Sequence, residues 1–339
     1  MGCSNSKNTE DDLGFDWWIL CDRQNWRGVG KLLKAFPDTA RLCQHKENDT
    51  TPHSMSGHLL LHRLCKEQGS PTSLIKSVLA ANPGACAVQD ATGNLPLHHA
   101  ALLPAVHEVI TLLLKPENQG SPAACKCTNS FGSTPLHLIC HHTQLASVSE
   151  LEDIIGLMIE ADSNNTVVSP AGVRDCGGKT PLDIAVESGG QDDILLLLMT
   201  ACPEGALSSN GGYGSMLHWA CAKARSARLI EMVCTYTPSA CNTVDDKGDL
   251  PMHTACELGD AVPVEVIQIL LTAYPECPRV IDKDGNTPLH SICEHAELNL
   301  SEVVGMLLEV DSGAAEVQDK EGNLAIHSAA ERERPSVFA

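Results

Sequence analysis

The sequence predicts an all-α fold, a solenoid of stacked helix-turn-helix units with short turns or hairpins at their tips. Three observations predict it. A turn followed by a helix start recurs along nearly the whole chain at steps of 35 to 46 residues, a spacing typical of stacked helical arrays. Each helix start is followed by a second apolar stripe of helical period. Prolines stand shortly after several of these stripes, where a helix ends.

The stretch 282–293 shows the recurring motif most fully. Its first residues predict a tight turn, because Gly285 can adopt a positive φ and Asp282 can bond its own backbone. Thr287 stands at the N-cap position, and Pro288 takes the first helical position, where its missing N–H costs nothing. A short first helix is therefore expected to begin at each copy of the motif.

An anchor residue equivalent to His290 recurs in every copy. These anchors are His62, His98, His137, Asp183, His218, His253, His290 and His327. A glycine stands five residues before each anchor except at Tyr213, which lies between Gly212 and Gly214. Such regular spacing at two fixed positions predicts one structural unit per anchor.

The second apolar pattern occupies positions i, i+1, i+4 and i+5, which form one stripe on a helix. The stripes begin at Leu74, Val109, Ile154, Ile194, Leu229, Val266 and Val303. Four of them are followed four residues later by the prolines Pro83, Pro203, Pro238 and Pro275. Each unit is thus predicted to hold two helices.

The order of turn, Thr-Pro-Leu-His, first helix and second helix resembles the ankyrin repeat. The resemblance covers roughly residues 50 to 339 in about eight units, which run longer than the period of about 33 residues typical of that repeat. It departs at Asp183, which replaces histidine, and at Met216 and Ala325, which replace proline. The resemblance implies stacked helix pairs and a role in binding other proteins.

Two units in the middle of the array are longer than the others. The gap from His137 to Ile154 predicts an enlarged loop around residues 147–152, and residues 116–127 and 164–172 hold further insertions. Insertions in repeat arrays fall in loops, often on the binding face. We therefore expect a partner to contact the middle of the array.

Three regions are predicted: a disordered, acylated segment 1–12, a divergent capping unit 13–45, and the array 46–339 with an incomplete last unit. Because an exposed end of a solenoid must be covered, Trp17 and Trp18 are expected in the cap. The alternative places them at a bilayer interface. The missing last helix favours a truncated chain, the alternative being a last helix with an exposed flank.

The first seven residues match the N-myristoylation pattern, with Ser6 at its Ser/Thr position. They resemble the doubly acylated N-termini of Src-type kinases, which implies myristate on Gly2 and palmitate on Cys3. One acyl chain gives only reversible binding, and the acidic residues after Lys7 leave no polybasic patch as a second signal. The protein is therefore predicted to lie peripherally on the cytoplasmic face of the plasma membrane. The alternative is that the N-terminus matches the acylation pattern by accident.

The 16 cysteines are expected to be reduced, because the chain shows neither a secretory signal nor a transmembrane run and so is predicted to be intracellular. Five stand three residues after an anchor: Cys65, Cys140, Cys221, Cys256 and Cys293. A closed zinc site needs four converging ligands, so these His-x-x-Cys pairs predict core packing instead of metal binding. No catalytic motif is found, and we expect no enzyme activity, cofactor or small-molecule substrate.

A net charge of −20 makes nucleic acid a poor partner, because acidic surfaces repel phosphate. Eight acidic residues at turn tips and after anchors predict an acidic surface: Asp245, Asp246, Glu257, Asp282, Asp284, Glu294, Asp319 and Glu321. This surface is predicted to bind a basic segment of another protein. The alternative is solvated carboxylates that serve only turn hydrogen bonds.

Together these patterns predict a non-catalytic scaffold or adaptor for protein interactions, tethered to a membrane by N-terminal acylation. One alternative is a soluble regulatory subunit or inhibitor, and another is the N-terminal part of a longer multidomain protein. Scaffolds of this kind take their specificity from surface residues that follow no code, so the sequence does not identify the partner.

Overall fold

The structure is a computed structural model of the chain. It describes residues 20–21, 23–35, 37, 60–67, 69–102, 107–115, 117, 120–142, 147–161, 169–207, 214–295 and 300–332. Within these residues every regular element is a helix, and the single pairing of strand type is a β-bridge between Gln318 and Leu324. The predicted all-α class is confirmed.

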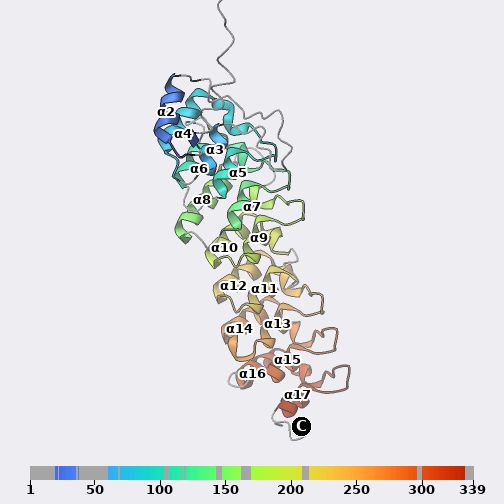
Figure 1. The fold of residues 1–339 in the computed structure, drawn as a ribbon. Coiled ribbons are helices and arrows are strands. Elements are labelled where there is room, and N and C mark those ends of the chain that lie inside the picture. The colour runs from blue at the N-terminus through green and yellow to red at the C-terminus, as the bar shows by residue number, and fades with distance from the viewer. Residues whose placement is uncertain are drawn as a thin grey trace, which may run out of the picture. The chain divides into compact units, whose positions relative to one another are not determined.

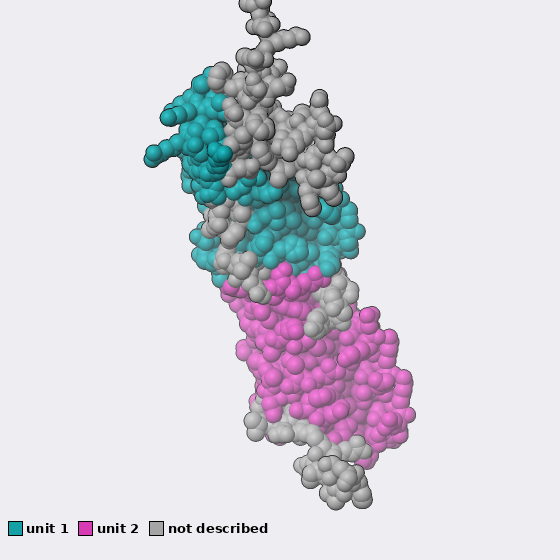
Figure 2. Space-filling model, in the orientation of Figure 1, with its two compact units in different colours: residues 1–184 teal, residues 185–339 magenta. Residues whose placement is uncertain are grey.

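The chain divides into two compact units, residues 1–184 and residues 185–339 (Figure 2). The helices of unit 1 are α2 Trp26–Ala35, α3 Leu60–Lys66, α4 Thr72–Ala81, α5 Pro96–Ala101, α6 His107–Leu114, α7 Pro135–Cys140 and α8 Val148–Glu160. The first helices α3, α5 and α7 pack in one row, and the second helices α2, α4, α6 and α8 pack in another.

Unit 2 repeats this arrangement. Its helices are α10 Asp192–Ala201, α11 Met216–Ala222, α12 Ala227–Tyr236, α13 Pro251–Glu257, α14 Val264–Ala273, α15 Pro288–His295, α16 Leu300–Val310 and α17 Ala325–Arg332, and α9 Pro181–Glu187 spans the division. The odd-numbered helices α11 to α17 pack on one another, as do α10, α12, α14 and α16. Figure 1 shows the turn tips of unit 2 on the side of α11, α13 and α15, away from α12, α14 and α16.

Several helices begin or end where the sequence predicts. Pro288 opens α15, and the stripe beginning at Val266 is buried along α14. Second helices end just before their prolines, which open short 3-10 helices, as in Pro83–Ala87, Pro203–Leu207 and Pro238–Asn242. Burying one four-residue stripe per second helix against neighbouring helices builds the core of each unit.

The predicted enlarged loop at residues 147–152 is wrong. This segment forms the first turn of α8, which begins at Val148. The Ser147 hydroxyl donates to the Glu150 carboxylate at 2.8 Å, a local Ser-x-x-Glu pattern that favours a helix start. The extra residues therefore lengthen the second helix by about one turn, and Leu151 joins its buried stripe.

The anchor histidines hold each first helix to the tip of the following repeat. In His253, Nδ1 accepts the N–H of Leu250 at 3.0 Å, so the ring hydrogen lies on Nε2, which donates to the Asn286 carbonyl at 3.1 Å. His98 and His218 make the same two bonds to their own repeat and the next. One neutral ring thus caps a helix start and links two repeats.

Asp183 reproduces one of these two bonds. Its Oδ2 accepts the backbone N–H and the hydroxyl of Thr180 at 2.7 and 2.8 Å, where a histidine would use Nδ1. An ionised carboxylate has no hydrogen to donate, so it cannot replace the Nε2–H link of the other anchors. Aspartate at this position therefore keeps the helix cap of α9 but lacks the N–H donor with which the histidine anchors bond the following repeat.

The first and last helices that the structure describes in full are α2 and α17. The predicted second helix of the region 13–45 is present as α2, with Val29 and Leu33 buried, whereas Trp17 and Trp18 lie outside the described residues. At the other end, the α17 residue Ile326 is 69 % exposed.

Candidate functional site

The tips of unit 2, residues 245–249, 282–286 and 319–323, are turns closed by their first residue. In the first tip, Asp245 Oδ1 accepts the N–H groups of Lys247 at 2.8 Å and Asp249 at 2.9 Å. The aspartates that open the other two tips accept the equivalent N–H groups at 2.7 to 2.9 Å. Three of the eight predicted acidic residues therefore have a structural role in closing the turns.

One backbone hydrogen bond joins each tip to the next. The N–H of Lys283 donates to the Lys247 carbonyl, and the N–H of Lys320 donates to the Asp284 carbonyl, both at 3.0 Å. Glycines permit this approach: Gly285 has φ +89°, and a Cβ on it would lie 2.8 Å from the Lys320 nitrogen. The tips of unit 2 therefore form a continuous, backbone-linked row.

The structure places all eight predicted acidic residues in unit 2. Five of them are exposed: Asp246, Asp284 and Glu321 on the tips, Glu257 at the end of α13, and Glu294 in the last turn of α15. Exposed lysines interrupt the tips at Lys247, Lys283 and Lys320. The surface is thus net acidic with regularly placed positive charges, which the sequence reasoning did not consider.

Asp249 is the residue that the sequence reasoning missed. It is 4 % exposed, and its backbone carbonyl accepts the Nε2–H of His218 at 2.8 Å. Burial raises the pKa of its carboxyl to about 6, reinforced by the charges of Glu257, Asp245 and Asp282 and opposed by a nearby lysine. The signal was available in the sequence, because the equivalent position of the next two tips is asparagine.

Most of the described cysteines lie in the core, whereas Cys176 is exposed and Cys127 and Cys202 are half-buried. The five thiols that stand three residues after an anchor, those of Cys65, Cys140, Cys221, Cys256 and Cys293, are buried. Burial raises the pKa of the Cys86 thiol to about 11 and that of Cys277 to about 12. Since the thiolate is the nucleophile and metal ligand, these thiols are poorly suited to either role.

Metal binding finds no support in the described ranges, where no three His, Cys, Asp or Glu side chains are placed to hold an ion. Both ring nitrogens of the anchor histidine His137 are occupied, Nδ1 by Thr134 and Nε2 by the Lys179 carbonyl. The His-x-x-Cys spacing therefore arises from helix capping and core packing.

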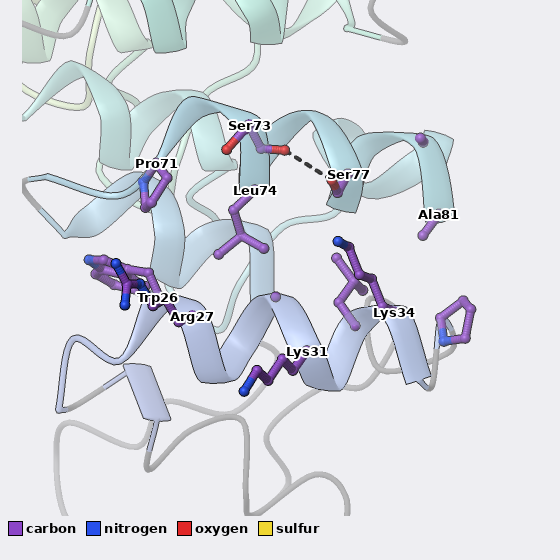
Figure 3. A pocket seen from close by; sticks show the side chains of 13 residues that line it. Trp26, Arg27, Lys31, Lys34, Pro71, Ser73, Leu74, Ser77 and Ala81 are labelled. Carbon is purple, nitrogen blue, oxygen red and sulfur yellow. Dashed lines mark hydrogen bonds between the residues drawn. The ribbon is translucent and has the colours of Figure 1, made fainter.

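A groove of about 870 Å³ lies between α2 and α4 in unit 1 (Figure 3). Trp26 and Leu74 contribute apolar surface, and Arg27, Lys31 and Lys34 contribute positive charge. Its described lining contains no carboxylate, histidine or cysteine. The absence of enzyme activity stays a prediction.

The predicted lipid attachment residues, Gly2 and Cys3, lie outside the described residues. None of the helices that the structure describes has the length and apolar character needed to span a bilayer. Acylation and membrane location therefore stay predictions.

Paired rows of short helices with linked turn tips define a helical repeat protein. A family model described as ankyrin repeats in three copies matches residues 107–207 and 217–314, more than half of the chain. The chain belongs to the ankyrin-repeat family. No curated protein matches the sequence. Repeats of this family are in general modules for protein–protein interaction and are typically not enzymes.

Proposed function

We propose that the chain is a non-catalytic scaffold or adaptor, built from about eight ankyrin units, whose tip row binds a basic segment of another protein. The observation that carries the proposal is the backbone-linked row of unit 2, on which Asp246, Asp284 and Glu321 are exposed. The net charge of −20 adds a long-range attraction for a basic partner.

The rigidity of the row favours binding. Because Asp245 and Asp282 already close their turns and a backbone bond joins the two tips, little backbone entropy is lost on capture. The interleaved Lys247 and Lys283 repel a uniformly positive segment at their own positions. A partner with alternating basic and neutral or acidic residues fits this pattern of charge better, and such complementarity fixes register.

A short peptide of alternating arginine and serine is a direct probe of this surface. The full-length wild-type protein is expected to bind it at low ionic strength and to release it as salt screens the charges. The same peptide with citrulline in place of arginine keeps the shape without the charge and is expected not to bind. Equal binding of both peptides would contradict a charge-based partner.

We further propose that myristate on Gly2 and palmitate on Cys3 tether the scaffold to the cytoplasmic face of the plasma membrane. The sequence motif supports this proposal, with Ser6 at the position that the myristoylation pattern requires. Two acyl chains give the stable attachment that one chain alone does not. The scaffold would then gather partners at a membrane surface.

The tether is tested by labelling cells with a clickable myristate analogue and fractionating their membranes. The wild type is expected to be labelled and membrane-bound, Gly2→Ala unlabelled and in the soluble fraction, and Cys3→Ser labelled but easily washed off. Asn5→Ala, which changes neither predicted acylation site nor Ser6, serves as the control and is expected to behave as the wild type. An unlabelled, soluble wild type would leave a soluble regulatory subunit or inhibitor as the better description.

A further inference from the structure

The basic groove is the space between α2 and α4 in unit 1 that is lined by Arg27, Lys31 and Lys34 (Figure 3). Its floor is apolar: Leu74 of α4 faces Gly30 of α2, where a Cβ would lie 3.9 Å from the Leu74 Cδ1. Gly30 carries no side chain into this space, which measures about 870 Å³. Ligand pockets typically measure roughly 300–1,000 Å³, so the groove has room for several side chains of a partner.

The three cations of the basic groove are exposed and have no partner among the described residues. Arg27, Lys31 and Lys34 follow one another along α2 at spacings of four and three residues, which place them on one side of the helix. No hydrogen bond or ion pair is described for any of their side chains. With no carboxylate in the described lining, the groove is complementary in charge to a negatively charged partner.

This positive charge is local. Among the second helices that the structure describes, α2 and α4 carry no acidic residue, whereas α6, α8, α10, α12, α14 and α16 each carry at least one. Charges more than about 8 Å away are largely screened at physiological ionic strength. The net charge of −20 therefore does not prevent the groove from attracting an acidic group at close range.

The shape of the groove favours a helix of a partner protein over a membrane surface. Both α2 and α4 have 10 residues, so the groove runs for about 15 Å between two parallel walls or slightly crossed ones. A flat anionic membrane would meet the exposed cations but would not enter the space above Leu74. An amphipathic helix, by contrast, lays its apolar face into a groove of this kind.

We propose that the basic groove binds an acidic amphipathic helix of a second partner protein. The apolar side chains of that helix contact Trp26 and Leu74, and its carboxylates pair with Arg27, Lys31 and Lys34. Because this partner is opposite in charge to the segment proposed for the tip row, the inference goes beyond the proposed function and does not depend on it. Two surfaces of opposite charge let one scaffold distinguish two partners, since each surface repels the other's ligand.

The probe is a fluorescent peptide of about 14 residues with leucines on one helical face, glutamates beside them and alanines elsewhere. The full-length wild type is expected to bind it at low ionic strength. A peptide with glutamine in place of glutamate and another with alanine in place of leucine are each expected to bind at least about tenfold more weakly. A wild type that binds none of the three peptides, or all three equally, would refute the proposal.

The groove variant combines Arg27→Gln, Lys31→Gln and Lys34→Gln. We expect its affinity for the glutamate peptide to fall about tenfold, while its urea midpoint stays near that of the wild type because the three side chains are exposed. Its affinity for the arginine–serine peptide should not decrease. Phosphatidylserine vesicles that bind through these three residues, with no binding of the peptide, would identify a membrane contact in place of a helix.

The control variant removes the same positive charge from the tip row through Lys247→Gln, Lys283→Gln and Lys320→Gln, all at exposed positions. It is expected to bind the glutamate peptide with near wild-type affinity. An equal loss in the groove and control variants would show that the peptide senses net charge alone, which contradicts a site in the groove.

Gly30→Leu tests the apolar floor separately from the charges. A side chain at this position fills the groove and meets only Leu74, at ordinary contact distance. We expect the affinity for the glutamate peptide to fall about tenfold. We also expect the urea midpoint to rise, because a glycine is removed from a helix interior. Opposite signs separate a blocked groove from a folding defect, and an unchanged affinity would contradict binding between α2 and α4.

Discussion

Replacing His253 with alanine is expected to lower the free energy of unfolding by about 3–5 kcal/mol. The side chain is fully buried and bonds the Leu250 N–H and the Asn286 carbonyl, which belong to adjacent repeats. Its removal leaves the Leu250 N–H without this acceptor, takes one of two donors from the Asn286 carbonyl, which still accepts the Asp282 N–H, and opens a cavity between the repeats. Urea unfolding followed by circular dichroism measures the loss, and we expect the midpoint of the wild type to fall markedly.

His327→Ala is the matched control. His327 occupies the equivalent anchor position of α17, where Nδ1 accepts the Leu324 N–H at 2.9 Å, but the residue is exposed. Its removal is expected to cost about 1 kcal/mol or less. Similar losses for the two variants would show that the anchors act only as helix caps and that the link between repeats contributes nothing.

Acidification is expected to destabilise the protein steeply below about pH 6.5. Burial lowers the pKa of His98 from 6.5 to about 4, and it lowers the pKa values of His137, His218 and His253 in the same direction. The unfolded chain takes up these protons first, so stability present above pH 6.5 is lost as the pH falls toward the folded pKa values. For His98 alone the loss approaches about 3 kcal/mol.

One group works in the other direction. The raised pKa of Asp249, about 6, means that falling pH relieves its charge and adds some stability. Because several histidines act against this single carboxyl, the free energy of unfolding is still expected to fall as the pH falls. Urea midpoints measured across this pH window test the sign, and His98→Ala should be less stable at neutral pH yet lose less on acidification. A midpoint that stays constant between about pH 7 and pH 5 would contradict the account.

The sequence sufficed to predict features that depend on neighbouring residues. Thr287 and Pro288 mark the start of α15 because capping and proline geometry act within one helical turn. The stripe from Val266 to Leu271 marks the buried face of α14 because the helical period alone puts these side chains together. The same local reasoning placed the five cysteines that stand three residues after an anchor in the core.

Features that depend on contacts between two structural elements could not be predicted from the local sequence. The start of α8 was misplaced because the gap between anchor and stripe was assigned to a loop, although Ser147 and Glu150 favour a helix start. The sequence located the acidic surface, but it did not show which of its residues close turns and which are exposed. Asp245 closes a turn, whereas Asp246 is exposed. The sequence reasoning missed Asp249 because the pKa of its carboxyl depends on burial and on charges from α13 and the next tip, which are distant in the sequence.

The binding of the arginine–serine peptide to a tip variant tests the central claim most directly. The variant carries Asp246→Asn, Asp284→Asn and Glu321→Gln, which neutralise the exposed acids of the row without touching the turn-closing aspartates. Its control carries three glutamine replacements on the second helices, at Glu231, Glu265 and Glu302, with the same change in net charge. The account predicts an affinity about tenfold weaker for the tip variant and near wild-type affinity for the control. Equal affinities of the two variants would show that the peptide senses only net charge, and the tip row would not be the binding surface.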